Sequence, residues 1–88
     1  MLVLVICRPA EGGDQEAFRR LVPGETEVLR DLKSNGILVD AWSPDRPGAV
    51  LTLEVPGTDE AYRIVADFPL VKSRLITTEI IPLHPIDV

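Results

Sequence analysis

The sequence predicts one α+β domain whose strands and helices follow the order β-α-β-β-α-β. Its 88 residues are enough for a single domain, so residues 1–88 are treated as one unit. Four short stretches are continuously apolar or alternate between apolar and polar residues, which is typical of strands. Two longer stretches repeat apolar residues every three or four positions, which indicates helices that bury one face.

The first strand and the first helix are the clearest elements. Leu2–Cys7 is apolar throughout and predicts a central strand that is covered on both faces. Asp14 is expected to cap the following helix, and Asn35-Gly36 to end it. Pro23 predicts a break or kink that would divide the helix into two pieces. One face of this helix carries Phe18, Leu21, Glu25, Val28, Leu29 and Leu32.

The second half of the chain predicts three more strands and one helix. The first of these strands alternates so that Leu38, Asp40 and Trp42 share a face. Thr58 is expected to cap the second helix, which would end at Pro69. The strands are expected at Ile37–Ser43, Ala49–Val55 and Ser73–Ile81, and a Pro-rich tail at Pro82–Val88.

This order is the split-βαβ arrangement of ferredoxin-like domains, with a four-stranded antiparallel sheet and two helices on one face. The strands nevertheless carry apolar side chains on both faces, and 45% of the residues are hydrophobic. A core this small cannot hold all of that material. We therefore expect a second copy to cover the open face, in a homodimer or a larger homo-oligomer.

Charge and composition exclude several classes of function. A net charge of −5 without a basic cluster argues against binding to nucleic acid or to an anionic membrane. One Cys and one His cannot form an ordinary zinc or iron–sulfur site, so no metal site is expected. Cys7 lies in an apolar run and is expected to be an inert core residue. The N-terminal apolar stretch resembles neither a signal peptide nor a membrane span, which predicts a cytoplasmic location.

Glu25 is the first candidate for chemistry. It lies on the apolar face of the first helix, where burial would raise the pKa of a carboxyl and suit it to proton transfer near neutral pH. If Pro23 breaks the helix, Glu25 instead becomes an exposed first-turn residue that the helix dipole favours. Glu27 points elsewhere and is expected on the surface.

Asp40, Trp42 and His84 are the other candidates, and each has two interpretations. Asp40 is either an edge residue that faces water or a polar group in a pocket. Trp42 either packs between subunits or forms the wall of a ligand pocket. His84 is either solvated in the tail or reaches the pocket of a neighbouring subunit, where imidazole could carry a proton.

With these residues in place, the chain resembles the muconolactone isomerase family. The resemblance rests on Glu25-x-Glu27, Leu32 followed by Gly36, Trp42, Val55-Pro56, Glu60-Ala61, Pro69-Leu70 and His84-Pro85, in that order. It implies a dimeric α/β barrel that assembles further, and a cofactor-free proton shift in a small unsaturated lactone during the breakdown of aromatic compounds. Glu25 matches the position of the base, while Trp42 and His84 match substrate-binding positions, to which we add Asp40.

Two features depart from the family and keep alternatives open. Leu4 and Ile6 stand where members that act on muconolactone carry polar residues, and Pro23 lies in a helix that lacks proline in those members. These differences suggest a more apolar substrate. The leading interpretation is an isomerase or cyclase of a small carbonyl compound from aromatic catabolism or polyketide metabolism. The alternatives are a non-catalytic ligand-binding or assembly domain and a cofactor-free monooxygenase.

Overall fold

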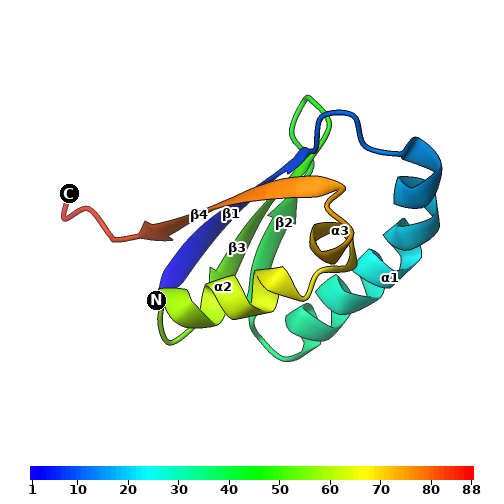
Figure 1. The fold of residues 1–88 in the computed structure, drawn as a ribbon. Coiled ribbons are helices and arrows are strands. Elements are labelled where there is room, and N and C mark those ends of the chain that lie inside the picture. Colours follow the sequence, from blue (N-terminus) through cyan, green and yellow to red (C-terminus); the bar gives the residue numbers. More distant parts are fainter.

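The computed structural model describes all 88 residues as one four-stranded sheet with three helices on one side (Figure 1). Neighbouring strands are antiparallel, in the order β2-β3-β1-β4. This is the expected ferredoxin-like arrangement, with one additional short helix. The elements are β1 (Leu2–Pro9), α1 (Gln15–Ser34), β2 (Leu38–Trp42), β3 (Ala49–Glu54), α2 (Thr58–Ala66), α3 (Pro69–Lys72) and β4 (Ile76–Leu83).

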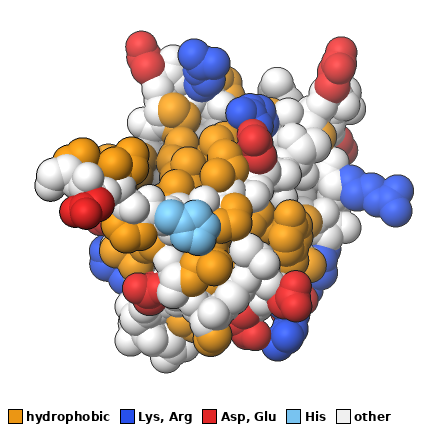
Figure 2. All heavy atoms as spheres, turned by 90° about the vertical axis from the view of Figure 1, so that its left-hand side faces the viewer, with side chains coloured by type: hydrophobic (Ala, Val, Ile, Leu, Met, Phe, Trp, Pro, Cys, Tyr) orange, Lys and Arg blue, Asp and Glu red, His pale blue; other side chains and the backbone are white.

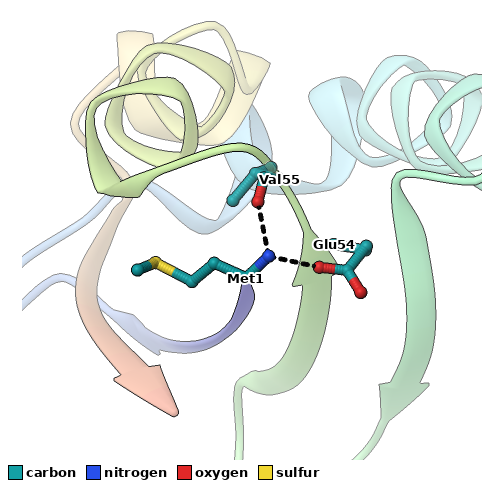
Figure 3. Close-up of polar contacts among 3 residues, drawn as sticks. All are labelled: Met1, Glu54 and Val55. Atoms are coloured by element: carbon teal, nitrogen blue, oxygen red, sulfur yellow. Dashed lines mark hydrogen bonds and ion pairs between the residues drawn. The ribbon is translucent and has the colours of Figure 1, made fainter. Parts of the chain in front are cut away.

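Strand β1 is central, as its continuous apolar sequence predicts. It pairs with β3 on one side and with β4 on the other. Val3, Val5 and Cys7 are buried on the helix side of the sheet, whereas Leu4 and Ile6 are half-buried on the opposite face. The N-terminal ammonium of Met1 holds the start of the strand by donating to a Glu54 carboxylate oxygen at 2.7 Å and to the Val55 carbonyl at 2.9 Å (Figure 3).

The core lies between the sheet and the shorter helices. Every buried residue is apolar, and the largest fully buried side chains are those of Phe68, Leu51, Leu53, Val3 and Val5. Helix α1 differs from α2 and α3 because none of its residues is buried. It packs against α3 and β2, and its apolar stripe remains half-exposed.

Helix α1 shows which of the two outcomes expected at Pro23 occurs: the helix is kinked and is not divided into two pieces. Asp14 caps the helix as predicted, since its carboxylate accepts from the backbone N–H of Glu16 and of Ala17. The helix then continues through Pro23, although Figure 1 shows a change of direction along its length. Proline removes one backbone donor, but the turns on both sides stay bonded, so the helix bends instead of ending. Glu25 therefore lies inside a helix and not in a first turn.

A β-bulge in β2 corrects the predicted alternation of that strand. Leu38 lies opposite Leu53, and Asp40 lies opposite Thr52. The chain therefore advances by two residues in β2 but by only one in β3 between these two pairs. Leu38 consequently packs into the core, whereas Asp40 and Trp42 lie on the other face of the sheet. The expectation that these three side chains share a face is wrong because the extra residue reverses the alternation.

The last third of the chain differs from expectation at three element boundaries. Gly57 is the cap residue of α2 and makes no side-chain cap, so Thr58 is the first helical residue and not the cap. Pro69 begins α3, and Arg74 then turns the chain with a positive φ of 59°, so β4 begins at Ile76. The strand continues through Pro82, which had been assigned to the tail. An edge strand tolerates proline because one side of it needs no donor.

The open face of the sheet is apolar and no helix of the chain covers it. Its half-buried or exposed side chains include Leu2, Leu4, Ile6, Val50, Ile81 and Leu83. Figure 2, which views the molecule from the side where β4 ends, shows hydrophobic patches with most charged groups around them. The prediction of a second copy on this face remains a prediction. None of the helices is long and apolar enough to cross a membrane.

Candidate functional site

Glu25 projects from α1 toward the start of α3. Its Oε1 accepts a hydrogen bond of 3.0 Å from the backbone N–H of Leu70. Leu70 lies in the first turn of α3, where backbone donors have no partner within the helix. The carboxylate therefore caps α3 from a different element of the chain, at the end of the helix that attracts negative charge.

The environment of Glu25 alters its acidity. Partial burial raises the pKa of the carboxyl above its usual value, and the hydrogen bond from Leu70 lowers it by a smaller amount. Burial, with the negative charge of Glu25 as a second cause, also raises the pKa of the Cys7 thiol to about 11. Cys7 is therefore a neutral thiol at pH 7, in agreement with the expected core residue. Glu25 is a carboxylate that holds a proton more readily than a surface glutamate.

The remaining predicted site residues do not meet Glu25 within one chain. Asp40 and Trp42 lie on the open face of β2, which is one outer strand of the sheet. Trp42 is 63% exposed, and the backbone N–H of Asp40 donates to the Thr52 hydroxyl at 3.0 Å. His84 follows β4, which is the opposite outer strand. A single subunit therefore separates the four residues into three places.

A pocket of about 400 Å³ lies beside the first turns of α1. Phe18 and Leu75 provide apolar lining, and Arg19 and Gln15 provide polar groups. The Asp14 carboxylate also lines the pocket but is engaged in capping the helix. The other lining residues come from the end of β1, the β1–α1 loop and the β2–β3 loop: Pro9, Ala10, Gly12, Gly13 and Pro47.

This pocket and Glu25 lie along the same face of α1. Phe18 and Glu25 are separated by seven residues, which is two turns or about 10 Å of helix. The sequence alone does not reveal this pocket, because its walls come from three segments that are distant in the chain. The one available signal was Phe18, an apolar residue on a helix stripe that turns out to be only half-buried.

Comparison with known proteins establishes the fold. No protein-family model and no curated protein matches the chain. Among solved structures, muconolactone isomerase is similar with a TM-score of 0.78 and 20% identity, over 100% of this chain and 95% of that one. A second similar structure is 5-chloro-2-hydroxyhydroquinone dehydrochlorinase (TftG) from Burkholderia phenoliruptrix AC1100, in complex with 2,5-dihydroxybenzoquinone. It has a TM-score of 0.75 and 19% identity, over 96% of this chain and 94% of that one.

These two likenesses confirm the fold to which the sequence resemblance pointed. The chain has the muconolactone isomerase-like fold, and both neighbours are matched over nearly their whole length. Identities near 20% carry the architecture and not the reaction, since one fold supports many activities. The reaction must therefore be inferred from the residues of this chain.

Proposed function

We propose that this protein is a cytoplasmic, cofactor-independent isomerase or cyclase that moves a proton within a small cyclic carbonyl compound. Glu25 is the proposed base. The observation that supports this role is a half-buried carboxylate of raised pKa on the face of α1 that also lines the main pocket. The raised pKa makes this carboxyl better suited than a surface glutamate to take up a proton and then return it, as a general base and acid must.

The proposed chemistry requires only one proton carrier. The Glu25 carboxylate takes a proton from a carbon next to a carbonyl, which leaves an enolate in the substrate. The carboxylic acid then returns the proton to a different carbon, so the atoms balance and no cofactor is consumed. The pocket of about 400 Å³ is of a size for a single-ring substrate. The names of both neighbours refer to small ring compounds, which supports the same class.

Assembly would complete the site in this proposal. The apolar open face would pair with that of a second copy in a homodimer or larger homo-oligomer. Trp42 and Asp40, the proposed substrate-binding residues on β2, would then contact a substrate from the space between the two sheets, on the face opposite to the helices. His84, at the end of β4 on a tail that projects from the body (Figure 1), would reach a neighbouring subunit. Light scattering tests the assembly, and a stable 9.7 kDa particle would contradict it.

The reaction is tested by following muconolactone in the ultraviolet with native protein, Glu25→Gln and Glu27→Gln. Glu27 is the matched control because it lies on the same helix, 69% exposed, in a surface ion pair with Arg30. We expect turnover by the native protein and the control, and a loss of about 100-fold or more in Glu25→Gln. Equal turnover by both variants would remove Glu25 from the chemistry. No turnover by native protein would exclude muconolactone as the substrate.

A non-catalytic ligand-binding domain is the second candidate, and one contact favours it. Glu25 already caps α3 through Leu70, and the pocket lining does not include Glu25. In this case the carboxylate only holds two helices together. Titration with 2,5-dihydroxybenzoquinone and muconolactone separates the two functions. Saturable binding without turnover, equal in native protein and Glu25→Gln, would support the binding domain.

A further inference from the structure

We propose that the loop end of the open sheet face binds a single-ring aromatic carboxylate, with Arg8 and Arg46 as the anion-binding groups. This site is distinct from the pocket beside α1. It lies on the face of the sheet opposite to the helices and does not depend on Glu25.

The site has an apolar floor that the strand register builds. Trp42, Val50 and Ile6 lie side by side across β2, β3 and β1, on the open face and at the same level. The β2–β3 loop rises beside them, and Pro44 and Pro47 contribute to the wall of a pocket of about 210 Å³. A cavity of about 150 Å³ is enough to hold a benzene ring. One aromatic ring with a small substituent therefore fits the available space.

Two guanidinium groups line this apolar pocket, in a protein whose net charge is −5. Arg46 makes no ion pair, so all of its donors are free. Arg8 pairs with Glu79 at 3.2 Å, but both side chains are more than half exposed. Exposed pairs of this kind contribute little to stability, and the guanidinium keeps further donors for an incoming carboxylate.

The two guanidinium groups and the apolar floor together favour one chemical class of ligand. The planar fork of arginine matches a carboxylate in a two-bond geometry, which a neutral ring cannot use. The Val50 and Ile6 side chains favour an apolar ring over a hydrated polar anion, and Trp42 offers an aromatic surface at the edge. The site requires that a second copy covers only the far end of this face, around Leu2, Leu4 and Leu83; a dimer that buries Trp42 and Val50 completely would overturn the proposal.

Benzoate is the probe, and the fluorescence of Trp42, the only tryptophan, is the readout. We expect a saturable change in emission that weakens as salt is raised, because the attraction is between exposed charges. Benzamide has the same ring without the charge, and it should bind at least tenfold more weakly. This comparison uses the unmodified protein, so it does not depend on the folding of a variant.

Substitution locates the site. Arg46→Met and Arg8→Met should each weaken benzoate binding at least fivefold. Arg63→Met should leave it unchanged, since Arg63 is also an exposed arginine but lies on α2, where it pairs with Glu60. The proposal is overturned if benzoate gives no saturable response, if benzamide binds as well as benzoate, or if both pocket variants keep native affinity. Binding that responds to Arg19→Met instead would assign benzoate to the pocket beside α1 and would also overturn it.

Discussion

Substitution of Gly48 by alanine should destabilise the protein strongly, because Gly48 is where the β2–β3 loop passes closest to the central strand. Its φ is +129°, which side chains other than glycine rarely adopt. A Cβ at this position would lie 2.3 Å from the carbonyl oxygen of Cys7, far inside van der Waals contact. Since that oxygen belongs to the backbone of β1, the loop itself must move.

The expected loss follows from these two effects. A residue forced into a sparsely populated backbone region costs about 1–3 kcal/mol, and the contact with Cys7 adds to this cost. We expect a loss of about 2–4 kcal/mol in the free energy of unfolding. A domain of this size has about 4–13 kcal/mol in total, so the loss is a large fraction. The melting temperature should fall by at least about 8 °C.

Gly24→Ala is the matched control for this experiment. Gly24 lies inside α1, and a Cβ there meets only the Pro69 side chain at an ordinary 3.8 Å. Alanine should stabilise the helix by about 0.5–1 kcal/mol. Urea denaturation of both variants, at one protein concentration, measures the pair. If Gly48→Ala is as stable as native protein, the loop does not pack on Cys7 as described and the argument fails.

Three other perturbations test the interior. Burial raises the pKa of the Glu25 carboxyl, so the native state binds this proton more tightly than the unfolded state does. The protonated carboxyl therefore contributes to the stability of the fold below about pH 4.5, and this contribution is lost as the pH rises. Glu25→Gln should therefore gain stability relative to native protein between pH 4 and pH 7, and a constant difference in urea titrations would contradict this. Cys7, with a pKa of about 11, should resist a thiol reagent at pH 8 until the protein is unfolded. Rapid labelling of the folded protein would show that the Cys7 side chain is not buried. Phe68→Ala should cost about 3–5 kcal/mol, because Phe68 is fully buried; a loss below 1 kcal/mol in denaturation would show that the core lies elsewhere.

Local sequence determined every element except the short helix α3. The apolar run of Leu2–Cys7 was enough to identify the central strand, and Asp14 was enough to identify the start of α1. These signals need only neighbouring residues, since side-chain periodicity and capping act within a few positions. The same local pattern singled out Glu25 as a carboxylate on an apolar stripe, and its half-buried position inside α1 agrees with that.

Tertiary structure decided how the elements meet. The bulge that places Asp40 and Trp42 on the face opposite to Leu38 depends on pairing with β3. No residue in the sequence of β2 predicts it. The partner of Glu25 is Leu70, which is 45 residues away in a helix that local sequence did not predict. The pockets likewise join loops that are distant in the chain. Register, burial and pocket shape arise from contacts between distant segments, so they are settled only when the sheet and the helices pack together.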